Sequence, residues 1–306
     1  MINFEYQTDL ETYLDRQISQ FNHVKLEYID PYTSIAGKTF LEIGYGAHSD
    51  IGGIFMSMLN QHGAAHPIYG IDTHHPKLQN YKETSVQLWK LAREKYNLIQ
   101  HSEDHYWGEK KCPIVKLHMN SEDMYLKNEL VDVIYSNAVL EHIQRPILAF
   151  KEMFRVLKPG GIAIHSWNPF TSLTMGGHDI GIPFYYPWAH LRLNREEHIQ
   201  KLKEVIADEK LRATSSVSEH TLTLEYINSR TVEKMYTGSL EDLNKVRIKD
   251  MCTFAVEAGF KILAEKTNPI AKEEIDKYLT NEIRNELIDY SDTELVCSSH
   301  RLILSK

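Results

Sequence analysis

The stretch TFLEIGYG (residues 39–46) is followed by PIYGID (residues 67–72), and the two together decide the fold class. Each begins as a short apolar run of the kind that forms a buried strand; the first ends in two glycines and the second in an acid. The apolar residues Ile54–Leu59 between them predict a helix. Strand, glycine turn, helix, strand and terminal acid make half of a parallel nucleotide-binding sheet.

The same alternation continues on both sides of this unit. Helices are predicted at 8–29, 76–100, 148–157, 251–257 and 275–287, and further strands at 114–117, 131–135, 162–165, 260–264 and 302–304. The sequence Lys158-Pro159-Gly160-Gly161 is expected to stop the helix before it, because proline and paired glycines cannot continue a helix. The prediction is an α/β fold with a doubly wound, mostly parallel seven-stranded sheet.

The alternation stops only between residues 168 and 239, which hold glycines, prolines and an aromatic cluster. We therefore divide the chain into four parts and expect the third to cap the carboxyl edge of the sheet, where open α/β sheets bind ligands. The parts are an N-terminal helical segment (1–35), a nucleotide-binding core (36–168), an insertion (169–240) and closing helices and strands (241–306).

Composition narrows the classes of partner. The 306 residues carry 34 basic and 42 acidic side chains, a net charge of −8, which disfavours nucleic acid. No apolar run approaches the ~20 residues of a membrane span, and the N-terminus lacks the pattern of a signal peptide. Three widely spaced cysteines fit reduced thiols rather than disulfides. We expect a cytoplasmic protein with a small-molecule acceptor; a homo-oligomer is left open.

The glycine turn and the acid point to a nucleoside ligand. Glycines after a strand let a ligand approach the backbone, and Asp72 can accept hydrogen bonds from a ribose. The dinucleotide fingerprint G-x-G-x-x-G is incomplete, since its third glycine is replaced by Ser49. Glu42 would repel a pyrophosphate but suits a cation. S-adenosylmethionine fits this turn: it has no phosphate for Glu42 to repel, and its ammonium and sulfonium groups are cations.

Five motifs in order resemble those of class I S-adenosylmethionine-dependent methyltransferases, in particular the small-molecule group called type 11. They are residues 41–46, 70–72, 120–124, 131–142 and 154–161. The resemblance implies S-adenosylmethionine as cofactor and a Rossmann-like methyltransferase fold. The cofactor-binding residues it implies are Glu42, Gly44, Tyr45, Gly46, Asp72, Asn120, Ser121 and Asn137. The chain departs from the family at His48, in place of a third glycine, and at Asn120, in place of an aspartate.

Histidines are the candidates for a catalytic base, because imidazole titrates near neutrality. His142 follows the fourth predicted strand and is expected near the transferred methyl group, but packing or capping at the start of the next helix is the favoured alternative. His178 and Asp179 follow two glycines and could approach a ligand, or simply form a turn. No metal is expected: the cysteines form no C-x-x-C pair, and His74-His75 is more simply a polar loop.

The predicted activity is methyl transfer to a small polar acceptor, with a hydroxyl of a sugar or sugar-linked metabolite preferred. That preference follows from a loose similarity of the insertion and of residues 289–295 to methyltransferases of bacterial surface-polysaccharide pathways. The alternatives are N-methylation of a small amine, a nicotinamide-dependent oxidoreductase, and a non-catalytic protein that binds S-adenosylmethionine.

Overall fold

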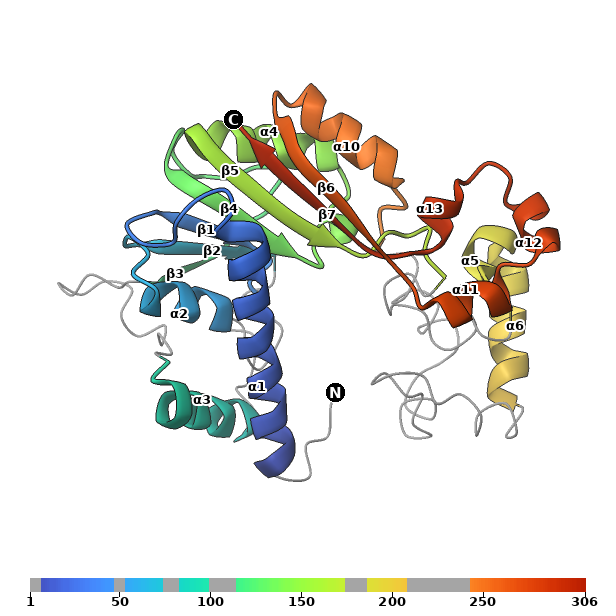
Figure 1. Cartoon of the computed structure of the whole chain (residues 1–306), viewed down its shortest axis with the longest axis horizontal. Coiled ribbons are helices and arrows are strands. Elements are labelled where there is room, and N and C mark those ends of the chain that lie inside the picture. The colour runs from blue at the N-terminus through green and yellow to red at the C-terminus, as the bar shows by residue number, and fades with distance from the viewer. Residues whose placement is uncertain (1–6, 47–52, 74–82, 99–113, 174–185, 208–242) are drawn as a thin grey trace.

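The computed structural model describes residues 7–46, 53–73, 83–98, 114–173, 186–207 and 243–306. Seven strands form one sheet in the order β3-β2-β1-β4-β5-β7-β6, in which β7 runs antiparallel to both its neighbours (Figure 1). The predicted seven-stranded, mostly parallel α/β fold is confirmed. The strands are β1 (Phe40–Ile43), β2 (Ile68–Asp72), β3 (Ile114–His118), β4 (Val131–Asn137), β5 (Leu157–Trp167), β6 (Lys261–Pro269) and β7 (Cys297–Ser305).

Helices cover both faces of the sheet because successive strand residues point to opposite faces. Phe40 belongs to a core cluster with α1 (Gln7–Val24), α2 (Ile54–Gln61) and α3 (Glu83–Tyr96). Its neighbour Leu41 belongs to a second cluster, with α4 (Pro146–Val156) and α10 (Ile248–Glu257). Helix α1 continues as a π-helical turn, η1 (Lys25–Ile29). The fold is thus a three-layer doubly wound sheet.

The residues after α4 differ from their prediction. Helix α4 ends at Val156, within one residue of the predicted end, but Leu157 already pairs with Val131, so the Lys-Pro-Gly-Gly sequence lies inside β5 and the strand begins earlier than predicted. Between Val131 and Val133 of β4 the partner residue in β5 changes from Leu157 to Ile162, so extra residues of β5 bulge out of the pairing at this point. A Cβ on Gly161 would lie 2.9 Å from the carbonyl oxygen of Asp132, so only glycine fits this bend.

The helix predicted at 275–287 is two helices, α11 (Lys272–Tyr278) and α12 (Asn281–Glu286). The side chain of Thr280 accepts a hydrogen bond from the Ile283 amide and so caps a new helix. With α13 (Asp292–Leu295) they form the connection between β6 and β7, beyond the end of the sheet (Figure 1).

A separate apolar cluster joins this connection to the described part of the insertion. Trp188, at the start of α5 (Ala189–Arg192), and Leu173 are fully buried against Ile283 and Leu295. Helix α6 (Arg195–Ala207) follows, and Asn194 caps it, because Asn194 Oδ1 accepts from the Glu197 amide at 3.0 Å.

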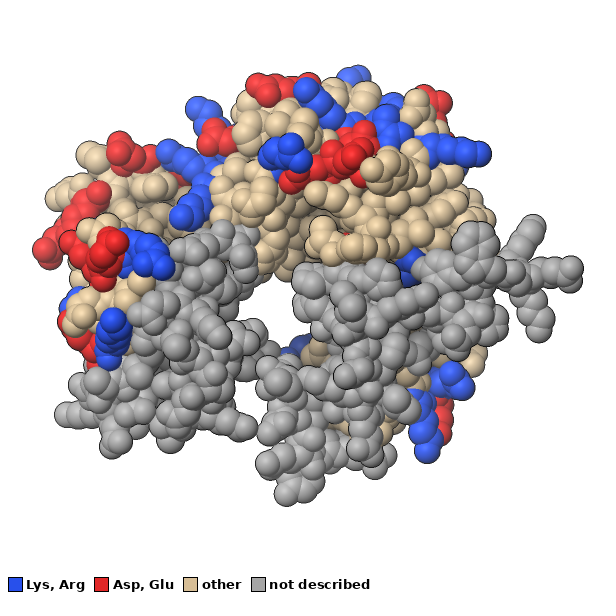
Figure 2. Space-filling model, turned by 180° about the vertical axis from the view of Figure 1, so that it is seen from behind, with Lys and Arg blue, Asp and Glu red and all other residues tan. Residues whose placement is uncertain are grey.

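The surface carries charges of both signs. Figure 2 shows acidic and basic side chains interspersed over the described part of one face. Among the helices in the described ranges, none has the length and apolar character needed to cross a membrane.

Candidate functional site

A cavity of about 170 Å³ opens at the carboxyl ends of β1 and β4. Five of the eight predicted cofactor-binding residues line it: Glu42, Gly44, Tyr45, Gly46 and Asn137. The remaining wall comes from α1, through Gln17, Gln20 and Phe21, and from Gly53, Ile54, Phe55 and Tyr135. The first helix therefore closes the site that the glycine turn opens.

The glycine turn is fixed by close packing and by a carboxylate. Gly44 has a φ of +71°, and a Cβ there would lie 2.3 Å from Val139 Cγ2, so the position excludes any side chain. The Gly46 amide donates to Asp72 Oδ2 at 3.1 Å. This bond holds the turn after β1 against the end of β2, and it brings the predicted ribose acceptor beside the predicted backbone approach.

Glu42 is the titratable group of the site with the most unusual surroundings. It lies between Gly70 and Tyr135 in one row of the sheet and is only 8% exposed. Its Oε2 makes no hydrogen bond with any described residue. Burial raises the pKa of Glu42 to about 8, with Asp72 adding to the rise and Lys116 opposing it. The site therefore holds a buried carboxyl group that a cationic ligand could complete.

Lys116, which sequence reasoning missed, lies in the same row beyond Gly70. Its Nζ is 5.4 Å from the centre of the Tyr45 ring, and a Cβ on Gly53 would come within 2.9 Å of it. A lysine in the apolar strand 114–117 was the available signal. Gln17 and Gln20 were also missed, because the helical pattern of α1 identified only its buried face.

Asp72 and the turn after β3 lie next to each other outside the cavity lining. The Met119 amide donates to the Asp72 carbonyl at 2.9 Å, and Asn120 follows directly. Asn120 is exposed, and its Oδ1 accepts from the Glu122 amide at 2.9 Å, while Ser121 is buried. The structure thus places all eight predicted residues along one edge of the sheet.

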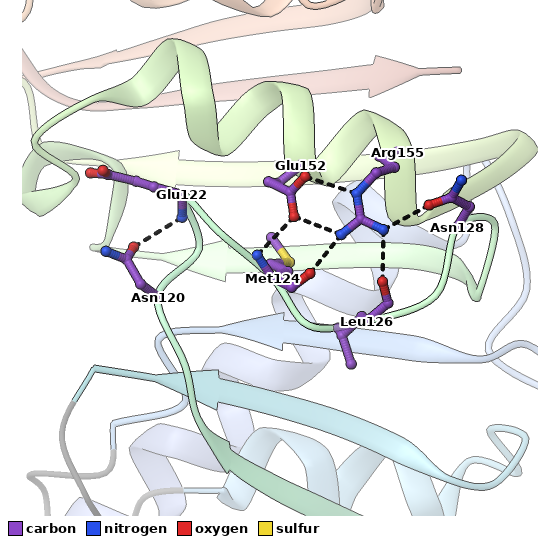
Figure 3. A network of polar contacts seen from close by, with 7 residues as sticks. All are labelled: Asn120, Glu122, Met124, Leu126, Asn128, Glu152 and Arg155. Carbon is purple, nitrogen blue, oxygen red and sulfur yellow. Dashed lines mark hydrogen bonds and ion pairs between the residues drawn. The ribbon is translucent and has the colours of Figure 1, made fainter.

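Arg155 holds this turn in place, as Figure 3 shows. Its guanidinium donates to the carbonyls of Met124 and Leu126, each at 2.7 Å, and to Glu152. Glu152 Oε2 in turn accepts from the Met124 amide at 2.7 Å. The hydrogen bond from Arg155 keeps the pKa of Glu152 below its ordinary value. Arg155, from the motif 154–161, therefore fixes the turn that carries Asn120 and Ser121.

Of the predicted catalytic residues, only His142 is described. It is exposed and ends the 3₁₀ helix η4 (Leu140–His142), which directly follows the carboxyl end of β4. His178 and Asp179 lie outside the described residues, as does His48. Their roles stay predictions.

Two buried groups near His142 have different surroundings. Burial lowers the pKa of His165 to about 3, and its Nδ1 lies 2.7 Å from Ser136 Oγ, as befits a core histidine. Burial raises the pKa of Glu141 to about 7. Glu141 Oε1 accepts from the Asn168 amide at 3.3 Å, so this carboxyl, which sequence reasoning missed, joins η4 to the residue after β5.

A family model described as a methyltransferase domain matches residues 41–165. An uncharacterized methyltransferase of Mycobacterium ulcerans (strain Agy99) is 38% identical over 60 residues, which are 20% of this chain and 23% of the relative. One of Mycobacteroides abscessus is 38% identical over 61 residues, with the same shares. The chain thus spans less than a quarter of the length of these relatives.

Two solved structures of low sequence identity align with most of the chain. A putative S-adenosylmethionine-dependent methyltransferase from Listeria monocytogenes is 15% identical, with a TM-score of 0.49 over 95% of this chain and 99% of its own. One from Mesorhizobium loti is 13% identical, with a TM-score of 0.45 over 89% and 93%. Residues 41–165 therefore match a methyltransferase domain, and their strands belong to a sheet of Rossmann-like order.

Proposed function

We propose that the whole protein transfers the methyl group of S-adenosylmethionine to a hydroxyl of a small polar acceptor, a sugar or a sugar-linked metabolite. One observation carries the first half of this proposal. A buried carboxyl group without a hydrogen-bond partner for its Oε2, Glu42, lines a cavity beside the glycine turn that Asp72 holds.

The chemistry of these groups fits the cofactor. Glu42 offers a negative charge to an ammonium or sulfonium, and Asp72 offers acceptors to ribose hydroxyls. The cavity of about 170 Å³ is smaller than the ~300 Å³ at which sites for drug-sized ligands begin. The cavity suits the methionine end of the cofactor. The nucleoside end would extend along the sheet edge toward Asp72 and Asn120. When bound, the cofactor supplies an electrophilic methyl group.

The residues of the chain then have two tasks. Positioning of the acceptor in line with the methyl group supplies much of the rate. A hydroxyl must also lose its proton, and His142 stands at the same edge as Asn137 to accept it. The pair His178 and Asp179 is the other candidate for this role. The sugar-type acceptor is supported by the sequence resemblance of the insertion and of residues 289–295.

The test separates cofactor from acceptor. Calorimetry on the wild-type protein measures S-adenosylmethionine and adenosylhomocysteine binding, and fluorescence titration with NADH measures the competing ligand. We expect micromolar binding of the first two and none of the third. Saturable NADH binding without S-adenosylmethionine binding would contradict the proposed cofactor.

Transfer of labelled methyl groups to a panel of sugars, nucleotide sugars and small amines then tests the acceptor. Labelling of hydroxyl-bearing sugars supports the proposal. Labelling of amines alone would replace it with N-methylation, and firm cofactor binding without any labelling would indicate a non-catalytic binder.

A further inference from the structure

A second polar cluster lies at the opposite end of the sheet from the cofactor site. It consists of Cys252 on α10, Glu265 on β6 and His300 on β7. Strands β4 and β5 separate β7 from β1, so the cluster shares no element with the cavity. The proposed function uses none of its three residues.

The three side chains converge because of sheet register. His300 pairs with Thr267, and Glu265 pairs with Leu302, so all four point to the face that α10 covers. One ligand-type atom from each of Cys252, Glu265 and His300 lies within 4.8 Å of the others. Glu265 is exposed, Cys252 is half-buried and His300 is fully buried. The cluster therefore extends from the core at His300 to the surface at Glu265, where an ion from solvent can reach it.

Distances within the cluster fit a tetrahedral ion. Bonds of 2.0–2.3 Å to Zn²⁺ at tetrahedral angles place ligand atoms ~3.3–3.8 Å apart. His300 Nε2 and Glu265 Oε1 already lie 3.3 Å apart. The Cys252 sulfur lies within 4.8 Å of both, so it has at most about 1 Å to move to reach the spacing of zinc ligands.

His300 is oriented as metal-bound histidines are. Its Nδ1 lies 3.0 Å from Thr267 Oγ1, which can accept the Nδ1 proton and leave the lone pair of Nε2 directed at the cluster. This Nε2 is buried and forms no hydrogen bond of normal geometry with any described residue.

Cys252 supplies the sulfur ligand of the cluster. On binding, a divalent cation takes the place of the thiol proton, which is released to solvent.

We propose that Cys252, Glu265 and His300 bind one Zn²⁺, with water as the fourth ligand. Cysteine, histidine and carboxylate are the ligands this ion takes, and three protein ligands with one open position are a recurrent zinc arrangement. Here the ion would join α10 to the β6–β7 hairpin and so stabilise the end of the sheet where the strands turn antiparallel. This site does not depend on the proposed function.

Spectroscopy with Co²⁺ in place of Zn²⁺ tests the site on the full-length, reduced, metal-stripped protein. We expect one Co²⁺ per chain, a thiolate-to-cobalt charge-transfer band, and its displacement by one equivalent of Zn²⁺. Zn²⁺ should also raise the thermal midpoint of the wild-type protein. Cys252→Ser should abolish the band, whereas Cys297→Ser, a control on β7 outside the cluster, should retain it.

Two further variants measure how much Glu265 and Thr267 contribute to metal affinity. Glu265→Gln should weaken Co²⁺ binding at least tenfold, and Thr267→Val should weaken it ~10–100-fold through the orientation of His300. Glu273→Gln, at an exposed glutamate outside the cluster, should leave Co²⁺ affinity unchanged. No charge-transfer band in the wild-type protein would overturn the proposal, as would a band that persists in Cys252→Ser. Equal affinity in Glu265→Gln and Glu273→Gln would remove Glu265 from the site.

Discussion

The two edges of the parallel sheet hold their carboxylates in opposite ways. At the amino edge, Asp132 accepts from the Thr39 amide at 2.9 Å and from Lys158 Nζ at 2.8 Å. Burial opposes its ionisation, but these hydrogen bonds hold the pKa of Asp132 below its ordinary value. At the carboxyl edge, Glu42 lies buried with a raised pKa and with an Oε2 that no described residue hydrogen-bonds.

This difference separates groups that stabilise the fold from groups prepared for a ligand. A carboxylate satisfied by its own chain contributes to folding, whereas a buried one left unsatisfied costs free energy until something binds. Asp132 at the amino edge therefore connects strands, whereas Glu42 at the carboxyl edge is available to bind a ligand. The following predictions test that contrast, beginning with the largest expected effect on activity.

The largest effect is expected for the base. If His142 accepts the acceptor proton, His142→Asn should lower turnover by about 10²-fold or more, the usual contribution of a general base. Cofactor affinity should change less than about twofold, because the imidazole has no role in holding the nucleoside. Steady-state kinetics and calorimetry measure the two quantities.

The exposed His66, which lies before β2 at the amino edge, supplies the matched control as His66→Asn. Turnover that stays at the wild-type level in His142→Asn would contradict the role of His142. His178→Ala would then be the decisive variant, with turnover again expected to fall while affinity stays intact.

Asp72 should give the next largest effect. Asp72→Asn keeps an oxygen that can accept from the Gly46 amide but loses the charge, and a hydrogen bond to a charged group contributes ~1.5–3 kcal/mol. We expect S-adenosylmethionine affinity to fall roughly 10- to 100-fold by calorimetry. Asp123→Asn, on the exposed turn nearby, should bind as the wild-type protein does. Equal affinity in the two variants would argue against a ribose acceptor at position 72.

The sequence predicts a contact between site residues best when those residues are close together in the chain. The glycine turn and Asp72 lie within one βαβ unit, so their contact follows from local pattern and topology. Lys116 reaches the same site only through the register of β2 with β3, which no local pattern encodes.

The helix stop after α4 shows a different limit. Proline and paired glycines indicate a break correctly, but whether they end a helix or bend a strand depends on the partner strand. Here Val131 and Val133 of β4 pair across the bulge. The residues of the cluster under α10 are spread over 48 positions, from Cys252 to His300, and only tertiary structure brings them together.

Arg155 tests whether the turn after β3 needs its internal hydrogen bonds. Arg155→Met keeps much of the aliphatic stem but leaves the Met124 and Leu126 carbonyls and Glu152 without their donor. We expect the free energy of unfolding in urea to fall by about 2 kcal/mol. Arg145→Met removes an ion pair to Glu122 whose arginine is 66% exposed, and should cost less than about 1 kcal/mol. Equal losses would mean that the network contributes no more than a surface pair.

The most specific effect concerns the pH dependence of Glu42. Its pKa is about 8 in the folded protein against an ordinary value of 4.5, so folding favours the protonated form. The stability contributed by this group is complete below pH 4.5 and is lost as the pH rises through 8.

Glu42→Gln cannot ionise and should escape that loss. At pH 8.5 its free energy of unfolding should lie several kcal/mol, at most about 4–5, above that of the wild-type protein, and the difference should shrink toward pH 4.5. Glu27→Gln, at an exposed glutamate, controls for the general loss of a charge. A cationic ligand reverses the preference, because it favours the carboxylate, so S-adenosylmethionine binding at pH 7 should release a proton in the wild-type protein and none in Glu42→Gln. Calorimetry in buffers of different ionisation enthalpy measures that proton, and binding without release would show that Glu42 does not face the charge of the ligand.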